Sequence, residues 1–202
     1  MKKFDIKSVS LLGLLLLLQA CTTTHLHTYP VVASFDDTAA DVSSGIETVD
    51  ASIKVMTLNV AHGRGERFHQ MLLDDETTLG NLDQISRLLI NEAPDVVALQ
   101  EADGPSFWSG DLNHVAYLAS QGHYMQSVRG VHADGPGLSY GTALISRVGL
   151  QEAESITFDP AYSFMPKGFV VSTIVWPEGS GIEVDIVSLH LTFSSEQVRR
   201  KQ

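Results

Sequence analysis

The fold of this chain is decided by one short run, Asp95-Val96-Val97-Ala98-Leu99-Gln100-Glu101. Four consecutive positions in it are apolar, which is typical of a strand buried on both faces of a sheet. Pro94 precedes the run and disfavours a continuous helix through this point. We therefore predict an inner strand of a sheet that is covered on both sides.

The sequence before this run supplies the rest of a strand-helix-strand unit. Residues 53–60 are mostly β-branched or apolar and predict a first strand. Leucine and isoleucine then recur at helical spacing between residues 79 and 89, with Thr77 or Thr78 as the expected helix cap. A strand, a helix and a buried strand in this order predict a right-handed βαβ unit with parallel neighbours.

The remaining sequence predicts a second helix followed by mostly antiparallel strands. The helix is expected over residues 111–120, ending at Gly122. Strands are expected over residues 124–128, 141–146, 153–158, 169–176 and 183–191. The last two flank Pro177-Glu178-Gly179-Ser180-Gly181 and predict a hairpin. A polar helix over residues 196–202 ends the chain without a stop signal, so either a truncation or a short solvated tail is expected.

The amino terminus has the pattern of an export signal. Met1-Lys2-Lys3 is followed by an apolar run over residues 9–18, shorter than the roughly 20 residues that span a bilayer. Leu18-Gln19-Ala20-Cys21 resembles the lipobox of bacterial lipoproteins, which implies a lipid on Cys21; an ordinary signal peptide is the alternative. We expect a signal at 1–21, a flexible tether at 22–50 and one domain at 51–202. The expected location is the cell envelope, in the outer membrane if the organism is Gram-negative.

Composition and charge limit the classes of function. An apolar content of 44% is enough for a packed core and excludes disorder throughout. The formal net charge of −11 repels polyanions at long range and disfavours nonspecific binding to nucleic acid. Cys21 is the only cysteine, so the domain contains no internal disulfide bond.

Two oxygen-bearing side chains stand at the carboxyl ends of the first two predicted strands. Ligands bind at this edge of an open α/β sheet, so Asn59 and Glu101 can converge. Carboxylate and amide oxygens suit Mg²⁺, Mn²⁺ or Ca²⁺. For Glu101 the alternative is a solvated carboxylate, and for Asn59 it is a turn former.

Histidines and glycines in this region have several interpretations. A dinucleotide-binding loop is excluded, because Phe68 stands where the third glycine should fall after Gly63 and Gly65. His62 and His69 lack metal-ligand spacing, and we interpret them as surface histidines. His190 lies in an apolar strand, where it is either a hydrogen-bonded core residue or a functional one.

Four segments in order resemble the motifs of the endonuclease/exonuclease/phosphatase (DNase I-like) superfamily. They are Val55-Met56-Thr57-Leu58-Asn59-Val60, Pro94-Asp95-Val96-Val97-Ala98-Leu99-Gln100-Glu101, Tyr140-Gly141-Thr142-Ala143-Leu144-Ile145-Ser146-Arg147 and Ser188-Leu189-His190-Leu191. The resemblance implies an α/β fold in which a two-layer β-sandwich is flanked by helices. Here that four-layer α/β/β/α architecture is expected to lack its carboxyl-terminal part.

The resemblance also implies roles for individual residues. Glu101 would bind the divalent metal with Asn59 beside it, and His190 would stabilise the phosphate or the leaving group. Lys167, in Met165-Pro166-Lys167-Gly168, is a candidate phosphate contact, with a solvated hairpin lysine as the alternative. Tyr140 and Arg147 are interpreted as framework residues.

The implied activity is metal-dependent phosphoester hydrolysis with Mg²⁺, Mn²⁺ or Ca²⁺. The substrate is expected to be a nucleic acid, a phospholipid or a small phosphoester; the lipid anchor implies a membrane, and no protein partner is predicted. Family members continue with a Gly-Asp-x-Asn motif and a Ser-Asp-His motif, and neither follows His190 here. We therefore expect this form to be inactive or nearly so. A non-catalytic remnant or a binding lipoprotein is the alternative.

Overall fold

The computed structural model describes residues 32–35, 52–67, 73–159 and 165–202. The predicted lipoprotein signal, most of the predicted tether and His69 lie outside the described residues. In chain order the elements are β1 (Val32–Phe35), β2 (Val55–Asn59), the short 3-10 helix η1 (Ala61–Gly63), α2 (Asp75–Glu92), β3 (Val96–Asp103), α3 (His114–Gln121), β4 (Gln126–Gly135), β5 (Leu138–Ser146), β6 (Gln151–Thr157), β7 (Gly168–Val175), β8 (Glu183–His190) and α4 (Glu196–Arg199).

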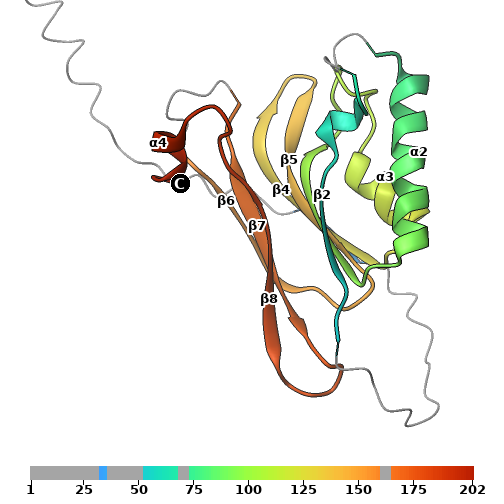
Figure 1. Cartoon of the computed structure of the whole chain (residues 1–202), viewed down its shortest axis with the longest axis vertical. Coiled ribbons are helices and arrows are strands. Elements are labelled where there is room, and N and C mark those ends of the chain that lie inside the picture. Colours follow the sequence, from blue (N-terminus) through green and yellow to red (C-terminus); the bar gives the residue numbers. More distant parts are fainter. Residues whose placement is uncertain (1–31, 36–51, 68–72, 160–164) are drawn as a thin grey trace, which may run out of the picture.

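Five strands form the larger sheet, in the order β1-β4-β5-β3-β2. β2 and β3 run parallel and are connected through α2, as the sequence predicts. The other neighbouring pairs are antiparallel. Figure 1 shows α2 and α3 covering one face of this sheet, while the smaller sheet lies against the opposite face.

Side chains of β3 alternate between two separate hydrophobic clusters, so this strand is buried on both faces as predicted. The cluster between the sheet and the helices contains Val97, Leu99, Leu82, Leu89 and Leu118. The cluster between the two sheets contains Val96, Ala98, Leu144, Val170 and Ile174. Full burial of one such Val or Leu side chain contributes about 1.5–3 kcal/mol. These two clusters hold the helices and both sheets around β3.

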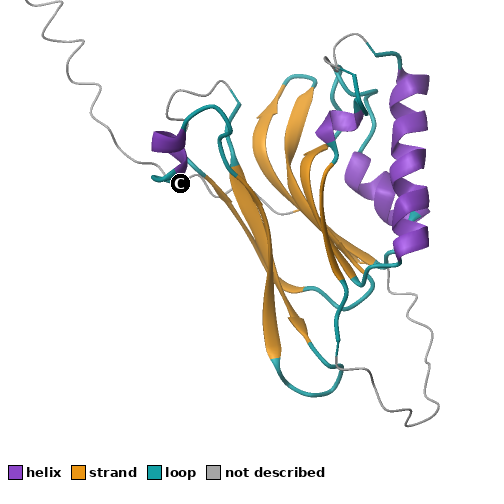
Figure 2. Ribbon diagram, viewed as in Figure 1, coloured by secondary structure: helices purple, strands orange, loops and turns teal. Residues whose placement is uncertain are grey.

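The smaller sheet is antiparallel and has the strand order β6-β7-β8. Its last two strands form the hairpin predicted around Pro177-Glu178-Gly179-Ser180-Gly181. On the outer face, Val187 and Leu189 are 47% and 45% exposed. In the described part of the chain, this layer carries only the short helix α4 near one end (Figure 2). The predicted fold class, α/β with two sheets and few helices, is confirmed.

Both longer helices begin at residues that differ slightly from the predicted starting points. The cap of α2 is Asp74 and not Thr77 or Thr78, and Asp74 Oδ1 accepts a hydrogen bond from the Thr77 backbone N–H at 2.7 Å. Helix α3 begins at His114, three residues later than predicted, because Asn113 caps its first turn. An N-cap of this kind typically contributes about 1 kcal/mol.

One strand lies inside the segment predicted to be a tether. Val32–Phe35 forms β1 and pairs antiparallel with β4, from Val32 opposite Arg129 to Phe35 opposite Gln126. The prediction of a tether over 22–50 is therefore wrong at these four residues. Among the described residues, no helix is both long and apolar enough to cross a membrane.

Candidate functional site

Glu101 stands at a β-bulge near the carboxyl end of β3. The register between β3 and β5 shifts between Gln100 and Ala102, which leaves Glu101 without a cross-strand partner. Its φ of 51° lies in the left-handed region, which costs energy for a residue with a side chain. Bulges re-aim side chains and are frequent next to active sites. The bulge directs this carboxylate toward groups from three other segments of the chain.

Four nitrogen-bearing side chains surround the Glu101 carboxylate. His62 Nε2 and Arg64 Nη1 lie 3.6 Å and 3.9 Å from Oε2. His190 Nε2 and Lys167 Nζ lie 3.7 Å and 3.9 Å from Oε1. These separations are ion-pair distances and are too long for strong hydrogen bonds. The Glu101 side chain is 17% exposed, so solvent still reaches it.

Lys167 and His190 come from the smaller sheet and meet beside this carboxylate. Gly168, the residue after Lys167, pairs with His190 across β7 and β8. Lys167 Nζ lies 3.3 Å from His190 Nδ1, and its side chain is only 8% exposed. The alternative of a solvated hairpin lysine is therefore wrong, because the hairpin strands carry Lys167 into the space between the sheets.

Burial lowers the pKa of both members of this pair. It lowers the pKa of Lys167, while the carboxylates of Glu101 and Asp103 oppose the change. Burial, reinforced by the positive charge of Lys167, lowers the pKa of His190 to about 4. Because the ammonium group can only donate, His190 Nδ1 accepts its proton and the ring proton resides on Nε2. The pair thus offers an ammonium group and an N–H donor beside Glu101.

His62 is buried, and the prediction that it is a surface histidine is wrong. The residue is 4% exposed, and its Nδ1 lies 2.8 Å from Asp103 Oδ1. Trp108 Nε1 donates to the other oxygen of Asp103 at 2.8 Å. His62 follows the end of β2, the same edge of the sheet that indicated Asn59 and Glu101. The position of His62 at this sheet edge was the feature of the sequence that indicated a place in the site. The absence of metal-ligand spacing wrongly indicated a surface residue.

Asn59 adopts the turn-forming role. Its Oδ1 accepts a hydrogen bond from the Ala61 backbone N–H at 2.8 Å, and the residue is exposed. This bond starts the turn that carries η1 and places His62 beside Glu101. Asn59 is thus linked to the site through the backbone, and its role as a metal neighbour stays a prediction.

Two buried framework contacts hold the site groups in place. Ser188 Oγ donates to Leu99 O at 2.7 Å and accepts from Gln100 Nε2 at 3.2 Å, so it ties β8 to β3 next to Glu101. Tyr140 is 1% exposed and donates from its hydroxyl to Pro166 O at 2.9 Å. Tyr140 therefore anchors the segment that carries Lys167.

A divalent cation fits this site as a partner of Glu101. In the described ranges no cluster of three or more His, Cys, Asp or Glu side chains is arranged to hold a metal ion. Mg²⁺, however, commonly uses one or two carboxylates and completes its shell with water and substrate phosphate. The Glu101 oxygens lack short hydrogen bonds to the described residues and, at 17% side-chain exposure, remain reachable from solvent, so they meet this requirement for one carboxylate ligand.

A Gly-Asp-x-Asn tetrapeptide occurs ahead of α3, as Gly110-Asp111-Leu112-Asn113. Asn113 Oδ1 accepts from the Ala116 backbone N–H at 3.1 Å, so it caps the helix. Asp111 is exposed, and its backbone N–H donates to Ser106 O at 3.0 Å. These contacts give the tetrapeptide a local structural role.

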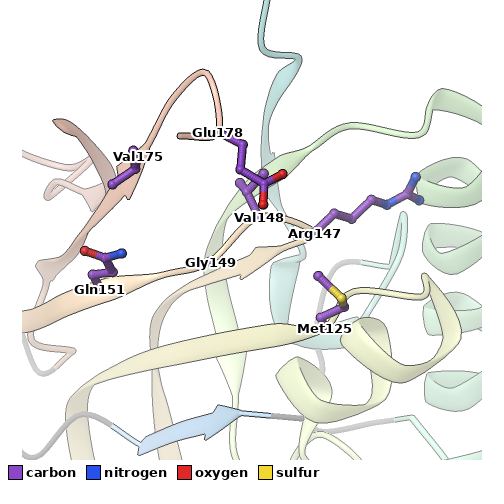
Figure 3. Close-up of a pocket in the computed structure, with 7 residues that line it drawn as sticks. All are labelled: Met125, Arg147, Val148, Gly149, Gln151, Val175 and Glu178. Atoms are coloured by element: carbon purple, nitrogen blue, oxygen red, sulfur yellow. The ribbon is translucent and has the colours of Figure 1, made fainter. Parts of the chain in front are cut away.

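A separate pocket lies at the opposite end of β3 (Figure 3). The Arg147 backbone N–H donates to Asp95 O at 2.9 Å, just before β3 begins. The pocket is lined by Met125, Arg147, Val148, Gly149, Gln151, Val175 and Glu178. The guanidinium of Arg147 turns out of it, donates to Gly122 O at 3.2 Å and stacks over Tyr124 at 5.0 Å. Arg147 therefore acts as a framework residue, as predicted.

Comparison with known proteins identifies a family and a fold. The model of the Endonuclease/Exonuclease/phosphatase family matches residues 56–178, a range that includes Glu101 and Lys167 and ends before His190. The structure is similar to that of an endonuclease/exonuclease/phosphatase family protein from Leptotrichia buccalis C-1013-b. The TM-score is 0.50 at 17% identity over 73% of this chain and 58% of that one.

A second solved structure is similar at a lower score. For humanized D. rerio TDP2 with 14 mutations, the TM-score is 0.47 at 20% identity, over 75% of this chain and 56% of that one. The chain thus spans less than two thirds of the length of either protein. No curated protein sequence matches this chain.

Proposed function

Since this chain belongs to the endonuclease/exonuclease/phosphatase family, we propose that it forms part of a divalent-metal-dependent phosphoester hydrolase. The observation that carries the proposal is the convergence of Lys167 and His190, from the smaller sheet, on Glu101 at the edge of the larger one. A cation ligand and two phosphate-binding donors are the parts that phosphoester hydrolysis requires.

The phosphate side of the site consists of Lys167 and His190. The ammonium group of Lys167 supplies positive charge at a position that is largely shielded from water. The His190 Nε2–H adds a directional donor within the same small volume. Hydrogen bonds from such groups to a phosphoryl oxygen are strengthened by the low local dielectric. Both groups would orient the phosphoester and stabilise negative charge that develops on it.

The cation side consists of Glu101, with Asn59 as a weaker candidate. Bound Mg²⁺, Mn²⁺ or Ca²⁺ would neutralise charge on the phosphoryl oxygens. Arg64 lies near Glu101 Oε2, the same oxygen that His62 faces, but the Arg64 side chain is 33% exposed. It can move toward solvent or toward a phosphate when a cation approaches Glu101. Glu101 then remains as the charged oxygen ligand.

The substrate class stays broad. Nucleic acid, phospholipid and small phosphoesters all present the group that Lys167 and His190 would bind. The net charge of −11 disfavours a long polyanion, since it repels such a molecule before the local cations engage it. Export and attachment through a lipid on Cys21 would place the domain in the cell envelope, beside membrane phosphoesters.

A non-catalytic binding lipoprotein is the second candidate. Among the described residues, Asp103 is the other carboxylate close to the site, and both of its oxygens are engaged by His62 and Trp108. No free carboxylate of the described part therefore faces Glu101 as a base for water. With a phosphodiester such as bis(4-nitrophenyl) phosphate and Mg²⁺, turnover that disappears in Glu101→Gln favours the enzyme. Binding without turnover favours the second candidate.

The phosphate side is tested with Lys167→Met. We expect the Kd for inorganic phosphate in the presence of Mg²⁺, measured by calorimetry, to rise by about tenfold or more, because a charged hydrogen bond is lost. Lys54→Met is the matched control, since Lys54 pairs with Glu92 on a surface that leaves its side chain 54% exposed. Equal phosphate affinity in Lys167→Met and Lys54→Met would exclude the proposed phosphate site.

A further inference from the structure

His62 is enclosed between two carboxylates. Its Nδ1 is hydrogen-bonded to Asp103 at 2.8 Å, while its Nε2 faces Glu101 Oε2 at 3.6 Å. Asp103 is fully buried and is held from its other side by Trp108. The ring also packs against Trp108 and Tyr140, with centroids 5.5 Å and 5.7 Å away. The orientation of the His62 ring is therefore fixed by contacts on several sides.

This orientation determines which ring nitrogen is available. A carboxylate accepts but does not donate, so the proton between His62 and Asp103 belongs to Nδ1. In the neutral ring, Nε2 then carries a lone pair that points at an oxygen of Glu101. A separation of 3.6 Å is too long for a hydrogen bond. The lone pair of Nε2 and the Glu101 oxygen repel each other, and a cation bound between them would relieve this repulsion.

We propose that His62 Nε2 is a nitrogen ligand of the divalent cation that Glu101 binds; this inference rests on the cation site proposed above. Two ligands that are each about 2.1 Å from an ion lie roughly 3.0–3.4 Å apart, from octahedral to tetrahedral geometry. The observed separation of 3.6 Å needs only a small closing movement. A histidine that ligates a metal usually donates its other N–H to a carboxylate, which is the arrangement of His62 and Asp103.

The backbone of η1 is strained at the point that presents this ring. Ala61 and His62 have φ values of 50° and 55°, in a region that residues with side chains rarely occupy. Asn81 Nδ2 holds the turn by donating to Gly63 O at 2.9 Å. Strain that the surrounding structure maintains is concentrated at functional sites. Here it keeps Nε2 directed at Glu101.

A nitrogen ligand has a consequence for metal choice. Imidazole favours transition metals such as Mn²⁺, Co²⁺ or Zn²⁺ over Mg²⁺, which prefers oxygen ligands. Arg64 and Lys167 are also close to Glu101, and their positive charges oppose a cation until phosphate supplies compensating negative charge. We therefore expect the site formed by Glu101 and His62 to bind Mn²⁺ more tightly than Mg²⁺, with water and phosphate in the other positions.

The direct test is electron spin echo envelope modulation on the full chain loaded with Mn²⁺ in the presence of inorganic phosphate, because this signal reports nitrogen bound to the metal. Wild type should show ¹⁴N modulation, and His62→Asn should lose it. Asparagine is chosen because it tolerates the positive φ of residue 62. His190→Asn and His123→Asn should keep the modulation; His123 is an exposed histidine that also has a positive φ, of 59°. Circular dichroism verifies that each variant is folded.

Affinity measurements complete the test. The Mn²⁺ Kd should rise by more than about tenfold in His62→Asn and by roughly 10- to 100-fold in Asp103→Asn, which removes the group that orients the ring. Modulation that is absent in wild type, that persists in His62→Asn or that disappears in His190→Asn would overturn the inference.

Failure of this inference can be told apart from failure of the cation site. If Mn²⁺ binds wild type, is lost in Glu101→Gln and shows no nitrogen coupling, His62 is not a ligand and the Glu101 site stands. If wild type does not bind Mn²⁺ even in the presence of inorganic phosphate, both the inference and the cation site are contradicted. Should His62→Asn not fold, the spectra of wild type and His190→Asn still decide between the two histidines.

Discussion

Lys167 Nζ lies 3.3 Å from His190 Nδ1, and both side chains lie within 4 Å of the Glu101 carboxylate. This contact joins the segment before β7 to the end of β8. It therefore places a cation and an imidazole from the smaller sheet at the bulge of the larger one. The charge of Lys167 adds to burial in disfavouring the protonated His190 ring.

His190 should be neutral near physiological pH, with its proton on Nε2. Burial, followed by the charge of Lys167, lowers its pKa to about 4 from the ordinary 6.5. ¹⁵N NMR of the imidazole in the metal-free chain measures both the tautomer and the titration midpoint. Lys167→Met should move the midpoint upward. A wild-type midpoint near 6.5, or a proton on Nδ1, would contradict the described geometry.

Gly168→Ala should destabilise the fold and disturb the site. A Cβ at this position would lie 2.2 Å from Ile156 O and 2.6 Å from His132 Cε1, so backbone has to move. Overpacking of this kind costs typically about 1–3 kcal/mol. Gly149→Ala is the matched control, since a Cβ there meets nothing within 4 Å. Urea unfolding compares the two variants, and equal midpoints would show that the close approach at Gly168 is absent.

Acid should weaken the fold through His132. Its ring nitrogens contact Thr157 Oγ1 and Thr142 Oγ1, and burial lowers its pKa from 6.5 to about 3. The unfolded chain therefore binds a proton at a higher pH than the folded chain does. The stability that His132 contributes is fully present above pH 6.5 and is lost progressively as the pH falls toward 3.

Urea unfolding between pH 6.5 and 5 isolates this effect from most carboxylate titration. Wild type should lose stability across this interval, and His132→Gln should lose less, although it is less stable at the upper end because it gives up a hydrogen bond. His114 and His190, whose pKa values are also lowered by burial, contribute to the same slope in both proteins. Parallel pH profiles for the two proteins would contradict the assignment to His132.

The layers of the fold could be predicted from the sequence, because the patterns that indicate a buried strand or an amphipathic helix each lie within one short stretch of residues. The apolar run before Glu101 predicted a strand buried on two faces, and the structure divides its side chains between two hydrophobic clusters. The helical spacing before Pro94 predicted α2, with a boundary error of a few residues at Asp74. Val32–Phe35 was missed, because a short edge strand acquires its structure by pairing with β4.

The site was only partly predictable, because burial near Glu101 depends on contacts between distant segments. Lys167 has no local feature that distinguishes it from a hairpin lysine, and its burial comes from packing against Glu101 and Tyr140. His62 was interpreted as surface because it lacks metal-ligand spacing, and its partner Asp103, 41 residues away, gives no local pattern that would correct this. Glu101 itself was predictable from its place at a strand end, although its bulge was not.

The most direct test of the account measures whether a cation and a phosphodiester bind to one site. Calorimetry gives the Kd of dimethyl phosphate with and without saturating Mn²⁺, in wild type, Glu101→Gln and the surface control Glu92→Gln. We predict that Mn²⁺ tightens phosphodiester binding by roughly 5- to 150-fold in wild type and in Glu92→Gln, and not in Glu101→Gln. Phosphodiester affinity that is independent of Mn²⁺, or coupling that persists without the Glu101 carboxylate, would contradict a shared metal and phosphate site.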